Sequence, residues 1–146
     1  MSAAVDYHAL AELRYRIRVF VSFSERAARE HGVEPKQHQA LLAIKGLPPE
    51  LRPTLRVIAE RLQLRHHSAV ELLDRLEAAG LATRVQNPDD RREVLVRLSA
   101  RGEQLLRSLS VVHQEELQAV GPDLLRALSA LIEPRKSKYE GRRATR

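Results

Sequence analysis

Residues 54–102 read TLRVIAERLQLRHHSAVELLDRLEAAGLATRVQNPDDRREVLVRLSARG, and this stretch decides the fold. Thr54 is a suitable N-cap for a helix over 55–62. A second helix begins at His66 and ends at Gly80, because glycine commonly follows the last residue of a helix. The apolar spacing in both segments predicts a helix-turn-helix. We expect its inner faces to hold Leu55, Ile58, Ala59, Leu62, Leu64, Ala69, Leu72, Leu73 and Leu76.

A two-stranded ribbon is expected next in the chain. Residues 81–86 and 93–98 are the predicted strands, because apolar and outward positions alternate along the second of them. The residues between them, 87–92, read Asn-Pro-Asp-Asp-Arg-Arg, and the first four carry strong turn chemistry. A helix-turn-helix followed by such a ribbon predicts a winged helix-turn-helix.

Longer helices are expected on both sides of this unit. Apolar stripes predict helices over about 7–31, 35–45 and 100–120. Gly121-Pro122 is expected to break the last of these, leaving a short helix that ends before Pro134. The fold class predicted is mainly α with a small β-wing, in one domain over residues 1–146.

The composition excludes several classes of protein. The chain of 146 residues contains no cysteine, so disulfides, zinc-thiolate sites and cysteine redox sensing are excluded. No run of about 18 apolar residues occurs, so we expect no membrane-spanning segment and a cytoplasmic protein. The histidines outside the second helix are scattered without ligand-like spacing, so we expect no enzyme activity, no metal site and no cofactor.

The net charge of +6 is unevenly distributed along the chain. Residues 135–146 carry six basic residues against one acidic residue, which is most of the excess. The tail 134–146 is therefore either a source of non-specific phosphate affinity or a disordered solubility tail, and the second reading is favoured. Bulk charge does not establish nucleic-acid binding here; only the placement of individual residues can.

Four short segments carry a family resemblance: IAERL at 58–62, SAVELLDRLEAAGL at 68–81, DRR at 90–92 and LSARG at 98–102. In combination they resemble the MarR family of bacterial regulators. The order of the predicted helices is also similar to that family, so the resemblance spans roughly residues 7–133.

This resemblance implies a homodimeric transcriptional regulator that binds near-palindromic double-stranded DNA. Residues 35–98 would form the winged helix-turn-helix, and 5–34 with 99–133 would form the dimerisation helices. The family includes repressors and activators, and we expect a repressor. Many members release DNA when a small aromatic or phenolic ligand binds. The alternative is a winged-helix module that binds proteins and does not recognise a DNA sequence.

Three features depart from the family pattern. Gln63 stands in the turn where helix-turn-helix units often have glycine, which is tolerable if this residue does not need a positive φ. His66, His67 and Glu71 stand where relatives often have serine, threonine or arginine, so no base preference can be transferred. The cysteine of the peroxide-sensing subgroup is absent.

The outward residues at the start of the second helix are candidates for DNA contact, because that end of a recognition helix meets base edges and phosphates. They are His66, His67, Ser68, Val70 and Glu71. The histidines could instead be ordinary surface residues, and Val70 could contact a thymine methyl or simply be exposed. Glu71 could accept a hydrogen bond from cytosine or pair with Arg75, and the pair is favoured.

The wing supplies the second set of candidates. An arginine at its tip, Arg91 or Arg92, is expected to enter the minor groove, while Asp90 orients one arginine; a solvated hairpin tip is the alternative. Lys36 and Arg75 are candidates for phosphate contact or are ordinary surface charges.

An effector site is the least supported expectation. Arg14, Tyr15 and Arg18 on the first helix could meet an anionic aromatic ligand, although each residue also has an obvious structural role.

Overall fold

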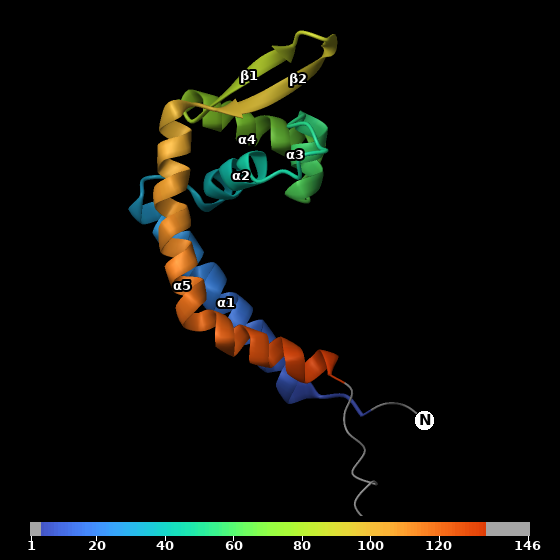
Figure 1. Ribbon diagram of the computed structural model, residues 1–146, viewed down its shortest axis with the longest axis vertical. Helices are drawn as coiled ribbons and strands as arrows, with labels where there is room; N and C mark the ends of the chain where they lie inside the picture. The colour runs from blue at the N-terminus through green and yellow to red at the C-terminus, as the bar shows by residue number, and fades with distance from the viewer. Residues whose placement is uncertain (1–3, 134–146) are drawn as a thin grey trace, which may run out of the picture. The chain divides into compact units, whose positions relative to one another are not determined.

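The computed structural model describes residues 4–133, so the predicted tail lies outside the described residues. The element order is α1 (Tyr7–Glu30), α2 (Pro35–Lys45), α3 (Leu55–Arg61), α4 (His66–Ala78), β1 (Ala82–Asn87), β2 (Asp90–Leu98) and α5 (Ala100–Ile132) (Figure 1). These elements form two compact units, one from residues 22–115 and one from the described parts of 1–21 and 116–146. No helix within residues 4–133 is long and apolar enough to cross a membrane.

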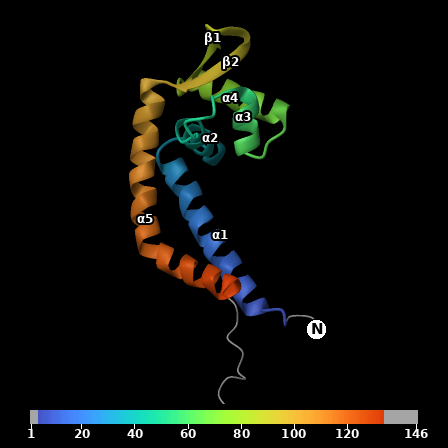
Figure 2. The same ribbon diagram turned by 45° about the vertical axis from the view of Figure 1, so that its right-hand side comes forward.

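The core of the 22–115 unit lies between α2, α3, α4 and the ribbon, and residues of α1 and α5 pack into it. Both views show the β1-β2 ribbon lying over α4 (Figures 1 and 2). The predicted inner faces of the helix-turn-helix are confirmed, since Ile58, Ala59 and the apolar stripe of α4 are buried. The large side chains that are almost fully buried in this unit are Leu41, Ile58, Leu73, Leu76, Leu81, Val96 and Leu109.

α4 ends just before Gly80, as predicted from the sequence. Gly80 has a φ of +70°, and this left-handed residue lets the chain reverse so that two trailing N–H groups reach the last turn. Gly80 donates to the carbonyl of Glu77 and Leu81 donates to that of Leu76, both at 2.9 Å. The chain thus leaves α4 in the direction that begins β1.

The turn between α3 and α4 corrects one expectation. Gln63 does adopt a positive φ, +54°, although it is not glycine. The chain reverses after α3 as it does after α4. The Gln63 N–H donates to the Glu60 carbonyl at 3.1 Å, and the Leu64 N–H donates to the Ala59 carbonyl at 2.8 Å. The Gln63 side chain adds a hydrogen bond from Nε2 to the Glu60 carbonyl at 2.8 Å. Closing this tight turn imposes the left-handed conformation, and these bonds offset its strain.

The ribbon is longer and less regular than predicted. β2 begins at Asp90, three residues before the predicted start, and the antiparallel pairing shifts register near the tip. Gln86 is opposite Val94 while Asn87 is opposite Asp90, so residues 91–93 form a bulge without partners on β1.

The base of the ribbon is joined to the segment that precedes α3. Leu95 pairs with Thr54 in an isolated antiparallel bridge, and the Val96 N–H donates to the Pro53 carbonyl at 2.8 Å. Thr54 also caps α3 as predicted, because its hydroxyl accepts from the Val57 N–H at 3.2 Å. One residue therefore connects the wing to the helix-turn-helix.

The predicted break at Gly121-Pro122 is wrong. α5 is continuous from Ala100 to Ile132 with Pro122 inside it. Proline removes one backbone N–H from a helix and does not have to end it when the flanking turns are well formed. Ser99 begins this helix as expected, since its hydroxyl accepts from the Gly102 N–H at 3.0 Å.

The second unit consists of the first part of α1 and the last part of α5. Arg16 Nη1 lies 3.4 Å from Asp123 Oδ2 and joins the two helices. Several large apolar side chains of this unit are exposed to an unusual degree. Tyr7 is 77% exposed, Leu125 64% and Ile132 68%.

Candidate nucleic-acid interface

The first turn of α4 lies at the surface of the 22–115 unit. His66, His67 and Glu71 are exposed, and Ser68 and Val70 are half-buried. The opposite face of the helix is buried in the core, which fixes the direction of the outward residues. No side chain caps the N-terminus of α4, so its first N–H groups can meet an anion.

The predicted pairing of Glu71 with Arg75 is wrong. Arg75 Nη1 instead lies 3.9 Å from Glu34 Oε2, and both side chains are more than half exposed. An exposed pair at this distance contributes little stability, so Arg75 is not held firmly away from other anions. Lys36, at the start of α2, is exposed.

The tip of the wing is held by its own backbone. Asp90 Oδ1 accepts from the Arg92 N–H at 3.0 Å, and Gln86 Nε2 donates to the Arg91 carbonyl at 2.8 Å. Asp90 thus fixes the backbone of one arginine, and among residues 4–133 it forms no ion pair with a guanidinium. Arg91 and Arg92 are both exposed.

Two further residues of the wing were not expected from the sequence to belong to the site. Asn87 is 4% exposed, accepts from the Asp89 N–H at 3.0 Å and donates from Nδ2 to Glu93 Oε2 at 2.7 Å. The same Glu93 oxygen lies 2.8 Å from Arg52 Nη1. The asparagine was readable as turn chemistry, but no local pattern relates Glu93 to Arg52, since the contact exists only after folding.

Arg84 on β1 connects the wing to α4. Its guanidinium forms an ion pair with Asp74, and its Nε lies 3.5 Å from Glu77 Oε1. The Arg84 backbone N–H also donates to Glu77 Oε1 at 3.0 Å, and Nη2 lies 3.4 Å from the Val70 carbonyl. The wing and α4 are therefore tied together by one side chain and one backbone group.

The residues considered for an effector are exposed on α1. Arg14, Tyr15 and Arg18 lie on the surface of the helix, and the guanidinium of Arg16 lies 5.3 Å from the centre of the Tyr15 ring. The unit made from the first part of α1 and the last part of α5 has a hollow of about 450 Å³, but other residues line it, and most of them are charged. They include Asp6, His8, Glu12, Arg16, Asp123 and Arg126.

The buried His38 and the half-buried His113 lie together in the 22–115 unit. His38 is 4% exposed, its ring centre lies 4.7 Å from that of His113, and its Nδ1 has no hydrogen-bond partner within residues 4–133. His113 Nε2 lies 2.8 Å from the Ser24 hydroxyl. Burial, with smaller contributions from His113 and His31, lowers the pKa of His38 to about 4, so it is neutral near pH 7.

The sequence also matches known proteins. Residues 31–93 match the model of the MarR family. An uncharacterized HTH-type transcriptional regulator of Bacillus subtilis, YkoM, is 32% identical over 104 residues, which are 68% of this chain and 66% of YkoM.

Solved structures share the fold. The MarR family transcription regulator SP03579 has a TM-score of 0.72 and 22% identity, over 86% of this chain and 83% of that one. A mutant of MepR from Staphylococcus aureus, bound to an oligodeoxyribonucleotide, has a TM-score of 0.65 and 19% identity, over 88% of this chain and 99% of that one. The chain therefore belongs to the MarR family of winged-helix transcriptional regulators.

Proposed function

We propose that the protein is a homodimeric repressor that binds a near-palindromic operator in double-stranded DNA. One observation carries the proposal. A single hollow is lined by His66 from the start of α4 and by Arg92 from the wing, so the two predicted reading elements meet on one surface. The DNA-bound MepR structure supports it, because a protein of the same fold binds an oligonucleotide.

In this proposal α4 enters the major groove and the wing reaches the adjacent minor groove. The exposed His66 and His67 approach base edges, while Lys36 and Arg75 are placed for phosphates. An arginine of the bulge, Arg91 or Arg92, enters the minor groove, attracted by its negative potential.

The dimer is supported by the unit made from α1 and α5. Two helices alone cannot bury the exposed Tyr7, Leu125 and Ile132, and an apolar surface of this kind usually contacts another chain. A second copy would bury this surface and hold the two α4 helices about 34 Å apart, one turn of DNA, or a multiple of that distance. Sedimentation equilibrium tests this step, and a strictly monomeric protein would contradict it.

The experiment for DNA binding is footprinting and titration on the DNA that flanks the protein's own gene, with random duplex as competitor. We expect preferential binding that weakens steeply with salt, because several phosphates are neutralised. The double variant Arg91→Ala/Arg92→Ala should bind much more weakly while remaining folded. Arg107→Ala on α5 is the control, since it removes an exposed arginine from a different element.

The alternative function, a winged-helix module that binds proteins, predicts a different result. The wild-type protein would then show no preference for operator DNA over random duplex. Repeating the footprint with phenolic ligands tests the effector, for which release of the DNA is expected. A promoter-reporter assay tests the sign of regulation, for which repression is expected.

A further inference from the structure

A hollow of about 360 Å³ lies between the start of α3, the start of α4 and the wing. Its lining includes Arg56 from α3, His66 from α4 and Arg92 from the wing. Arg56 was not among the residues expected to contact DNA. Three nitrogen-bearing side chains that can donate hydrogen bonds thus line one hollow from three elements.

Two carboxylates also line this hollow, and both already have partners. Glu93 pairs with Arg52 at 2.8 Å and accepts from Asn87 at 2.7 Å. Asp90 accepts from the Arg92 backbone N–H at 3.0 Å. Arg56 occurs in none of the ion pairs found within residues 4–133. Arg92 occurs in none of these pairs either, so the guanidinium groups of Arg56 and Arg92 are both left in this hollow to meet an external anion.

In DNA bound as proposed, a phosphate of the backbone would lie at this hollow. A major groove and its neighbouring minor groove are separated by one sugar-phosphate backbone. If His66 lies at the major groove and the wing reaches the minor groove, that backbone must pass between them. The hollow between α4 and the wing lies on that path, and Arg56 forms part of its lining.

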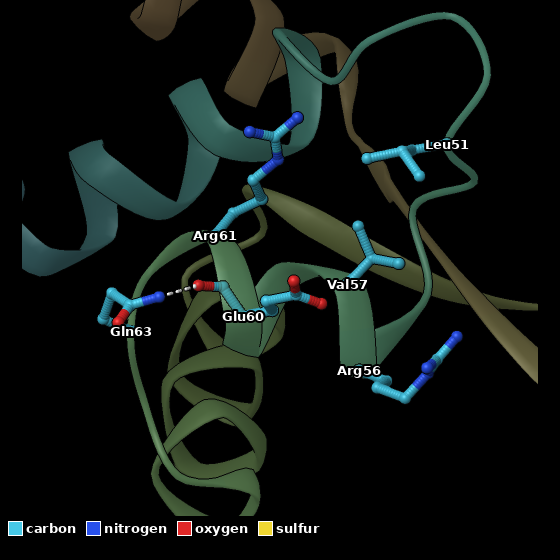
Figure 3. A pocket seen from close by; sticks show the side chains of 6 residues that line it. All are labelled: Leu51, Arg56, Val57, Glu60, Arg61 and Gln63. Atoms are coloured by element: carbon cyan, nitrogen blue, oxygen red, sulfur yellow. Dashed lines mark hydrogen bonds between the residues drawn. The ribbon is translucent and has the colours of Figure 1, made fainter.

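We propose that Arg56 binds a phosphate of the DNA backbone that crosses this hollow. His66 supplies an N–H donor from the facing wall. This assignment rests on the proposed function and adds a phosphate site to it. Arg56 is exposed and lies near the N-terminal end of α3, whereas Arg61 lies at its C-terminal end. Figure 3 shows their guanidinium groups pointing apart.

Arg61 therefore provides a matched control on the same helix. It lines a neighbouring hollow with Leu51, Val57 and Gln63, which Figure 3 shows, and it is absent from the hollow next to the wing. Arg56 lines both hollows. Substituting either arginine removes one exposed positive charge from α3, so a difference between the two variants reports position and not net charge.

The experiment compares wild type, Arg56→Gln, Arg56→Lys and Arg61→Gln in operator titrations at several salt concentrations. Affinity falls with salt, so the slope of log affinity against log salt is negative. Loss of one phosphate contact makes this slope less steep by about 0.9, or by about 1.8 for a dimer that loses one contact per subunit. We expect that loss for Arg56→Gln, the wild-type slope for Arg61→Gln, and a slope near wild type for Arg56→Lys. Circular dichroism confirms that each variant is folded.

The outcomes separate this inference from the proposed function. If the wild-type protein shows no operator preference, the proposed function fails before Arg56 is considered. If the wild type binds and the double wing variant weakens binding, an unchanged slope for Arg56→Gln overturns the Arg56 assignment alone. Equal slope losses for Arg56→Gln and Arg61→Gln also overturn it, because the effect would then be one of general charge.

Discussion

His38 should make the protein less stable when the pH falls from 7 to 5. Its pKa is about 4 in the folded protein against 6.5 for an ordinary histidine. The unfolded chain therefore takes up the proton first, so the stability is fully present above pH 6.5 and is lost as the pH falls towards 4. Linkage gives a loss of about 2 kcal/mol between pH 7 and pH 5.

The assay is urea unfolding followed by circular dichroism at both pH values, for wild type and for His38→Leu. The variant removes the titrating ring and its unpartnered nitrogen, so it should lose about 2 kcal/mol less than wild type on the same pH change. Titrating groups that do not interact with His38 contribute equally to both proteins and cancel. His67→Gln, which removes an exposed imidazole, should retain the wild-type loss.

An equal loss of stability in wild type and His38→Leu would refute the reasoning. A second measurement does not need the variant. The ring protons of His38, followed by NMR in the folded wild-type protein, should show little titration between pH 7 and pH 5 and most of it below pH 5. Protonation of His38 in that range would mean that its burial against His113 does not depress the pKa as the geometry indicates.

Two further predictions concern backbone geometry. Gln63→Gly should raise the unfolding free energy by about 0.5–1 kcal/mol, because glycine adopts a φ of +54° without strain; a lower thermal midpoint would show that the side-chain bond to Glu60 matters more. Gly102→Ala should destabilise the protein by about 1–3 kcal/mol or more, since a Cβ there would lie 2.0 Å from the Leu81 carbonyl oxygen. Gly121→Ala, with nothing within 4 Å of the added Cβ, should instead stabilise α5 by up to about 1 kcal/mol, and similar midpoints for the two alanine variants would contradict the predicted clash.

Local signals predicted most of the elements. Thr54 and Gly80 mark helix ends through chemistry contained within a few residues, so their roles were predictable. The buried stripe of α4 follows from spacing alone. Pro122 was misleading, because a proline signals a break only when the surrounding helix is weak, and α5 has long helical segments on both sides.

The details of the candidate site depended on contacts between distant residues. Glu34 competes with Glu71 for Arg75, and Arg52 reaches Glu93 from the segment before α3. Neither contact has a periodic or motif signal. The bulge at residues 91–93 is similar, since the register shift between Gln86 and the buried Asn87 could not be read from alternation.

The ties made by Arg84 have a consequence for the operator itself. Because this residue holds β1 to Asp74 and Glu77 of α4, the wing cannot easily slide along the recognition helix. For a protein that reads DNA as proposed, the distance between the bases read in the major groove and the minor-groove step entered by the wing is then constant. Each half-site should tolerate base changes far better than the insertion of a single base pair between those two positions.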